Sequence, residues 1–287
     1  MRKKYAVYLG MAAILGLAFA SNAGAADGPH WTYDTDEQSE NGQGKWGGLE
    51  DVSQAPPPLN YPYAECGIGT HQSPIDLAVQ ADENTLDRKK GNHAEQWEDK
   101  TNLLDFKYVY DTAPDFIDTG HTVKVNTSAN YTGKLYIGND AYPLIQYHFH
   151  TPAEHVIGKK KPYAGELHFV HIRPDGKTAV VGVFLEEGAQ DNSAIWTILT
   201  NVVQGQGHNQ TGLGLNPKSL LPRDKSHFYS YAGSLTTPPC SEGVNWYVLK
   251  EPLKISSSQL SQLQDLYSGN NRTPQALNGR TVSGNLR

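Results

Sequence analysis

The segment Gln146-Tyr147-His148-Phe149-His150 constrains the fold more than any other stretch of the chain. Polar and aromatic residues alternate in it with a period of two, which is the period of a β-strand. We therefore expect Gln146, His148 and His150 on one face of a sheet and Tyr147 and Phe149 on the other. Two imidazoles that lie two residues apart on a stiff strand are close enough to bind one metal ion.

A second predicted strand, with the sequence ELHFVH at 166–171, can supply a third imidazole from His168. Three neutral imidazoles suit zinc, and they leave the fourth tetrahedral position open for water. The pattern therefore predicts a zinc-hydroxide enzyme. Isolated histidines are more simply interpreted as ordinary core or surface residues, and we interpret four others in that way: His30, His93, His208 and His227.

Two polar residues share strand faces with the proposed ligands. Gln146 lies on the face of His148, and Glu166 lies on the face of His168, whereas His171 points the opposite way. Each of the two can accept the second ring N–H of its neighbour and so fix the tautomer and the orientation of the imidazole.

The 287-residue chain predicts one mainly β domain, since no linker divides its middle. Short β-type runs follow one another with little helix between them, which favours a mostly antiparallel sheet. The predicted strands include residues 106–110, 122–126, 134–137, 144–149, 167–172 and 179–185. Helices are predicted at 191–203 and 256–268, the second with serines available to cap its start.

The first 25 residues predict a secretory signal peptide, with a basic start, an apolar run and a small-residue cleavage site. The mature domain is then 26–287, periplasmic or secreted, with no membrane span after cleavage. In an oxidising compartment Cys66 and Cys240, the only cysteines, predict a disulfide bond. The net charge of −6 argues against a nucleic-acid-binding protein.

One alternative is a cupin, a β-barrel class of binding proteins and oxygenases. His148-x-His150 followed by Glu154 resembles a cupin metal motif, in which the glutamate itself binds the metal. A cupin needs its later histidine in a second glycine-flanked motif. This chain instead has ELHFVH and then SLTTPP at 234–239.

The motifs QYHFHTPAEH, ELHFVH, YAGSLTTPPCSEGVNW and HQSPID together resemble the α-class carbonic anhydrases, over residues 31–280. Cys66 and Cys240 match the disulfide positions of the exported bacterial branch. The resemblance implies a large, mostly antiparallel twisted sheet with short peripheral helices, and reversible hydration of carbon dioxide to bicarbonate. A non-catalytic relative that keeps the fold as a binding module is a second alternative, although such relatives typically lose a zinc histidine.

Carried over by position, the resemblance implies that His148, His150 and His168 bind Zn²⁺. It implies that Thr236 accepts a hydrogen bond from zinc-bound hydroxide and that Glu154 accepts one from Thr236. The remaining matched residues are those of the substrate pocket. Thr237 matches a bicarbonate contact, and the apolar wall for carbon dioxide matches Val170, Val180, Leu235, Val244 and Trp246.

His121 matches the proton shuttle of the family, and Tyr33 matches a tyrosine of the water chain between shuttle and zinc. Lys124 departs from the neutral polar residues that often line this network. A lysine there can reorient the shuttle or lower the pKa of its imidazole by repulsion. The resemblance also implies binding of sulfonamide and anion inhibitors, and it leaves a homodimer open.

Overall fold

The computed structural model describes residues 28–52, 60–78, 104–205 and 207–285. The predicted signal peptide at 1–25 and His93 lie outside these residues. Within them, no helix is both long enough and apolar enough to cross a membrane.

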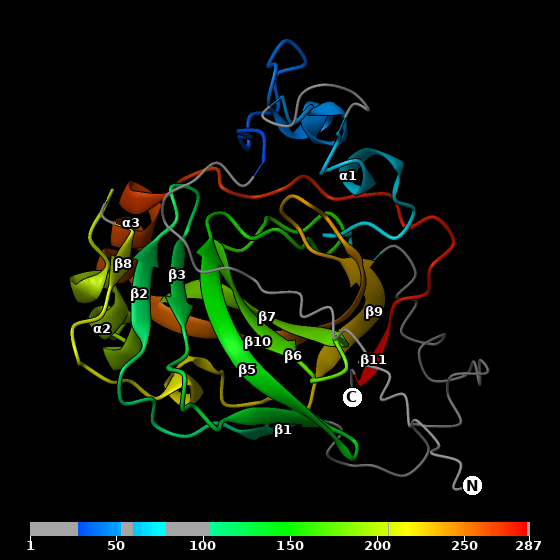
Figure 1. Cartoon of the computed structure of the whole chain (residues 1–287). Helices are drawn as coiled ribbons and strands as arrows, with labels where there is room; N and C mark the ends of the chain where they lie inside the picture. Colours follow the sequence, from blue (N-terminus) through cyan, green and yellow to red (C-terminus); the bar gives the residue numbers. More distant parts are fainter. Residues whose placement is uncertain (1–27, 53–59, 79–103, 206, 286–287) are drawn as a thin grey trace, which may run out of the picture.

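One large sheet dominates the described part of the chain (Figure 1). Its strands run in the order β11-β9-β10-β7-β6-β5-β3-β2-β8, and β4 pairs with both β1 and β5. Neighbouring strands are antiparallel except for β7 and β10, which are parallel. The strands are β1 Leu104–Lys107, β2 Asp115–Asp118, β3 Val123–Asn126, β4 Lys134–Ile137, β5 Asp140–His150, β6 Gly165–Ile172, β7 Thr178–Gly188, β8 His208–Asn209, β9 Phe228–Ser234, β10 Glu242–Ser256 and β11 Ser283–Asn285.

The predicted mainly β, mostly antiparallel architecture is confirmed, and the strands around the histidines are longer than predicted. Strand β10, the longest at 15 residues, is not among the predicted strands. It contains Pro252, and its pairing with β7 shifts between Leu249 and Leu253. Proline has no N–H to donate to a neighbouring strand, so a proline within a segment argues against a strand when only the sequence is known.

The helices are short and lie around the sheet (Figure 1). They are α1 Glu65–Ile68, α2 Ser193–Asn201 and α3 Ser257–Leu266, with 3₁₀ turns η1 Gln43–Gly48 and η3 Pro217–Leu220. The predicted serine cap is present, because the Ser256 hydroxyl accepts a hydrogen bond from the Gln259 N–H at 3.2 Å. Asn192 caps α2 in the same way, with its side chain accepting from the N–H groups of Ala194 and Ile195.

The two faces of the sheet bury two separate apolar clusters. Tyr147, Phe149, Leu167 and Phe169 belong to the larger cluster, which also buries the apolar faces of α2 and α3. The smaller cluster on the other face includes Val170, Val180, Trp246, Tyr231 and Ile75. The alternation along β5 and β6 is as predicted, and it places the imidazoles of His148, His150 and His168 on the opposite face from the larger cluster.

The predicted disulfide joins Cys66, in α1, to Cys240, in the turn between β9 and β10. The nearby Arg272 guanidinium is buried and donates hydrogen bonds to Gln72 Oε1 and to Ser73 O, both at 2.8 Å, and to Cys66 O at 3.2 Å. The C-terminal segment that carries Arg272 therefore bonds directly to the disulfide region, over the ring of Trp46.

His171 provides a test of stability against pH. It is fully buried on the face away from the other histidines, where Tyr108 OH lies 2.6 Å from its Nε2. Burial lowers the pKa of His171 to about 4, whereas an unfolded histidine has a pKa of about 6.5. The unfolded chain therefore binds the proton more tightly. The contribution of neutral, buried His171 to the free energy of unfolding is complete above about pH 6.5. As the pH falls towards 4, this contribution decreases by about 1.4 kcal/mol per pH unit.

We expect His171→Gln to remove this component of the pH dependence. Urea unfolding at pH 7, 6, 5 and 4.5 measures it as the difference in slope between variant and unmodified protein, so that contributions from other histidines cancel. Equal slopes in the two proteins would contradict the assignment, even if the variant is less stable at every pH.

Candidate metal centre

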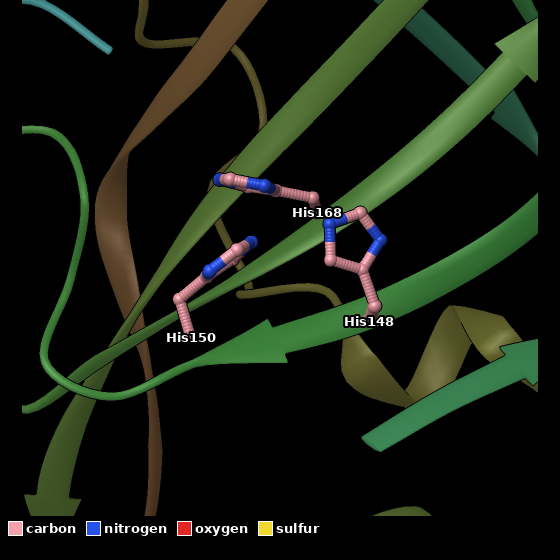
Figure 2. A group of neighbouring side chains, drawn as sticks. All are labelled: His148, His150 and His168. Carbon is pink, nitrogen blue, oxygen red and sulfur yellow. The ribbon is translucent and has the colours of Figure 1, made fainter. Parts of the chain in front are cut away.

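Three imidazoles converge from two neighbouring strands (Figure 2). His148 and His150 project from β5 and His168 projects from β6, with His148 and His168 directly opposite each other in the strand register. One nitrogen atom of each ring lies within 4.8 Å of a nitrogen of the other two. His150 and His168 are buried and His148 is half-buried, so solvent reaches the group on the side of His148.

Each ring is held by a contact to one of its nitrogens. His148 Nδ1 lies 2.9 Å from Gln146 Oε1, and His150 Nδ1 lies 2.6 Å from the main-chain oxygen of Asn270. Glu166 Oε1 lies 3.1 Å from His168 Nε2, although the ring is not aligned for a good hydrogen bond. The contacts leave Nε2 of His148, Nε2 of His150 and Nδ1 of His168 for a ligand.

The electrostatic surroundings suit a metal cation. Burial lowers the pKa of all three imidazoles, and repulsion between neighbouring rings adds to the effect on His148. They are therefore neutral, which is the form that binds a metal. His150 Nε2 is buried and has no hydrogen-bond partner among the described residues. An unsatisfied buried nitrogen costs free energy, and a metal ion in contact with it would remove that cost.

Glu166 supports the group through His155. Glu166 Oε1 lies 2.7 Å from His155 Nδ1, and Glu166 Oε2 accepts the N–H groups of Glu154 and His155. Burial alone would raise the pKa of the Glu166 carboxyl, but His155 and His168 hold it well below its usual range. Gly182 makes the arrangement possible, because a Cβ there would lie 2.6 Å from Glu166 Oε1.

Sequence reasoning did not assign His155, Gly182 or Asn270. His155 ends the QYHFHTPAEH motif, which was the available signal. Gly182 acts by leaving room for Glu166, and Asn270 holds His150 through a main-chain oxygen, so neither role can be recognised from the local sequence pattern.

Glu154 is placed beside the imidazoles but outside the group that can share one metal ion. Its Oε1 accepts the Arg272 N–H at 2.7 Å, and its Oε2 has no hydrogen-bond partner among the described residues. Burial raises the pKa of Glu154 to about 7, against the lowering effects of His168, the Arg272 N–H and the Thr236 hydroxyl. A divalent cation on the imidazoles would further favour its ionised form. The carboxylate thus neighbours both the imidazoles and Thr236.

Two rows of residues cross the sheet beside the imidazoles. In the first row Lys124 on β3 pairs with His148, which pairs with His168, which pairs with Gly182 on β7. In the second row the residues change from polar to apolar across the sheet: Asn126, Gln146, Val170, Val180 and Trp246. The face of the sheet beside the imidazoles, here called the wall, is polar on β3 and β5 and apolar from β6 to β10.

The apolar wall predicted from the sequence is one contiguous patch. Val170, Val180, Val244 and Trp246 belong to the smaller apolar cluster, and Leu235 packs against it half-buried. The Trp246 ring centroid lies 4.8 Å from that of His168, and its Nε1 donates to Ser234 O at 2.9 Å. Thr237 is half-buried and its main-chain oxygen accepts the N–H of Cys240 at 2.8 Å.

His121 lies in the turn between β2 and β3, after Gly120, whose φ of +79° favours glycine. Its ring stacks on Trp31, with centroids 3.9 Å apart and planes at 9°. The Tyr33 ring lies between, 6.5 Å from the ring of His121 and 6.4 Å from that of His150. The Tyr33 hydroxyl is buried and without a hydrogen-bond partner among the described residues, so it is free to bind water.

Of the two effects predicted for Lys124, the lowering of the His121 pKa by repulsion is wrong. Burial lowers the pKa of His121, repulsion from His30 adds to this, and Asp118 opposes it. Lys124 is not among the causes because its strand position sets it opposite His148 instead. The His30 ring centroid, 6.2 Å from that of His121, is the neighbour that the isolated position of His30 in the sequence concealed.

A family model and a search of known proteins both match this chain to carbonic anhydrases. Residues 57–286 match the family model described as eukaryotic-type carbonic anhydrase. A carbonic anhydrase from Klebsiella pneumoniae is 34% identical over 279 residues, which cover 96% of this chain and 98% of the relative.

Two solved structures share the fold. The α-carbonic anhydrase from Thermovibrio ammonificans, in complex with the inhibitor sulfanilamide, is 33% identical with a TM-score of 0.71, covering 89% of this chain and 99% of that one. The α-carbonic anhydrase from Photobacterium profundum is 32% identical with a TM-score of 0.70, covering 88% and 99%. These matches exclude the cupin alternative, and the chain belongs to the α-carbonic anhydrase family and is a carbonic anhydrase.

Proposed function

We propose that the chain is a zinc-dependent carbonic anhydrase that catalyses the reversible hydration of carbon dioxide to bicarbonate and a proton. The observation that carries this proposal is the convergence of three neutral imidazoles, two of which are held by a hydrogen bond through their other ring nitrogen. His148, His150 and His168 would hold the Zn²⁺. When bound, zinc supplies hydroxide near neutrality by lowering the pKa of its water, to a value of about 7 that is established for carbonic anhydrases.

Thr236 and Glu154 would orient the nucleophile. Because the ionised Glu154 carboxyl only accepts hydrogen bonds, a Thr236 hydroxyl that donates to it has only its lone pairs left for another partner. That partner must then be a donor. The nucleophile's own O–H meets this requirement, and its lone pair is turned towards the substrate.

The apolar wall would hold carbon dioxide, an uncharged molecule whose transfer out of water costs little free energy. Val170, Val180, Leu235, Val244 and Trp246 offer no hydrogen bonds that would favour water in its place, apart from a Trp246 N–H that already binds Ser234 O. Thr237, half-buried beside Thr236, would contact the bicarbonate product.

His121 would carry the proton to bulk solvent, with a water on Tyr33 O–H as the link.

Replacing His121 by alanine should lower kcat for hydration about tenfold or more in weak buffer. The value of kcat/KM should stay unchanged, because proton export follows the chemical step. Stopped-flow assays with increasing imidazole buffer check this, since imidazole should restore kcat. A kcat equal to that of the unmodified protein in weak buffer would contradict the role.

Metal removal tests the proposed function as a whole. We expect rapid hydration of carbon dioxide in a stopped-flow assay, its loss after chelation, and its return with one equivalent of Zn²⁺. A folded, zinc-loaded protein without hydration activity would contradict the proposal and would favour a non-catalytic binding module.

The cellular setting follows from the same proposal. We propose that residues 1–25 direct export and that 26–287 form one catalytic domain acting in the periplasm or outside the cell, where the disulfide is stable. Sulfonamides should inhibit it by binding at the metal; the Thermovibrio relative forms a complex with the inhibitor sulfanilamide. Small anions should compete for the same position.

A further inference from the structure

Lys124 occupies an unusual position for a lysine. It lies on β3 directly opposite His148 in the strand register. Its neighbours Val123 and Val125 point into the larger apolar cluster, so Lys124 lies on the other face, with the three imidazoles. The side chain is half-buried in the polar part of the wall.

The ammonium of Lys124 takes part in no hydrogen bond or ion pair within the described residues. The carboxylate that favours its charged form is Asp115, and that group already accepts hydrogen bonds from His208 Nδ1 and from the Asn209 N–H. Burial lowers the pKa of Lys124, which reflects the loss of water around the charge. A partly desolvated cation that makes no hydrogen bond or ion pair within the described residues interacts more strongly with an incoming anion than an exposed one does.

The wall beside the imidazoles separates a charged side from an apolar side. Lys124, Asn126 and Gln146 lie on β3 and β5, whereas the residues proposed to hold carbon dioxide lie from β6 to β10. Carbon dioxide carries no charge, so the ammonium does not strengthen its binding. Bicarbonate, the product of the proposed reaction, carries a full negative charge.

We propose that Lys124 is a specificity-determining residue that forms, with the metal held by the three imidazoles, a subsite for bicarbonate and other small oxyanions. The proposal rests on the proposed function. Lys124 holds the anion by charge, without a role in the chemical step. It therefore strengthens binding of the anionic reactant and increases inhibition by anions, and it leaves the binding of carbon dioxide unchanged.

Equilibrium binding of bicarbonate tests the subsite without measuring turnover. The protein is loaded with Co²⁺, whose visible absorption responds to its ligands, and titrated with sodium bicarbonate at constant ionic strength and pH. The variants are Lys124→Gln and Lys124→Arg. Lys177→Gln is the matched control, because Lys177 is an exposed lysine in the turn before β7 and its loss changes the net charge equally.

We expect Lys124→Gln to weaken bicarbonate binding about tenfold, as loss of a nearby unit charge in a partly desolvated site should do. Lys124→Arg should keep most of the affinity, and Lys177→Gln should match the unmodified protein. Unchanged affinity in Lys124→Gln would overturn the proposal. So would an equal loss in Lys177→Gln, which would indicate net charge alone, or an equal loss in Lys124→Arg, which would show that charge is not what is recognised.

Failure of the proposed function would look different. In that case the unmodified protein would not bind Co²⁺ at the imidazoles, or its zinc form would not hydrate carbon dioxide. The comparison between Lys124 variants is interpreted only after both properties are present in the unmodified protein.

Discussion

Replacing His150 by alanine should remove both zinc binding and catalysis. His150 is fully buried, its Nδ1 lies 2.6 Å from the main-chain oxygen of Asn270, and its Nε2 has no hydrogen-bond partner among the described residues. Two remaining imidazoles cannot hold zinc in a three-ligand site. We expect hydration of carbon dioxide to fall more than about 100-fold, which is the upper range for loss of a group that merely supports a ligand.

Zinc content after dialysis and stopped-flow hydration measure the two effects together. His71→Ala is the control, because His71 is an exposed imidazole near the disulfide and outside the metal centre. Circular dichroism shows whether the His150 variant is folded. A folded His150→Ala protein that retains one equivalent of zinc and full activity would refute the site.

Removing the disulfide should cause a large loss of stability. Cys66 and Cys240 are 174 residues apart, so the bond restricts a very long loop of the unfolded chain. We expect the double variant Cys66→Ser/Cys240→Ser to lose about 3–5 kcal/mol of unfolding free energy. This is a substantial part of the total of about 5–15 kcal/mol that is typical of folded domains.

Guanidinium unfolding of the zinc-loaded protein measures this loss. A reducing agent should lower the midpoint of the unmodified protein towards that of the double variant, and it should leave the double variant unchanged. Equal midpoints of the oxidised protein and the variant would show that the bond does not stabilise the fold.

The centre of the sheet could be predicted because its pattern is local. Alternation of polar and aromatic residues along 146–150 places the imidazoles on one face and Tyr147 and Phe149 on the other, as the structure has them. Strand β10 lacks such a signal, because Pro252 interrupts it and its pairing with β7 is irregular. The disulfide could be predicted from the count of cysteines and the expected export.

Other features of the site depend on contacts between distant segments. Asn270 reaches His150 through a main-chain oxygen, which any residue could supply. Trp31 stacks on His121 from 90 positions earlier in the chain. The expected repulsion of His121 by Lys124 was wrong for the same reason, since position along one strand does not reveal that His30 is the neighbour that lowers the pKa of His121 by repulsion.

The contacts of Asn270 have a consequence for the order in which the protein matures. This residue, close to the end of the chain, holds His150 through its oxygen, and its side chain binds the main chain at Phe149, Thr151 and His121. Arg272, two residues later, fixes Glu154. Residues up to Arg272 must therefore be folded against β5 before His150 and Glu154 have the contacts seen here, although both lie more than 100 positions earlier in the sequence.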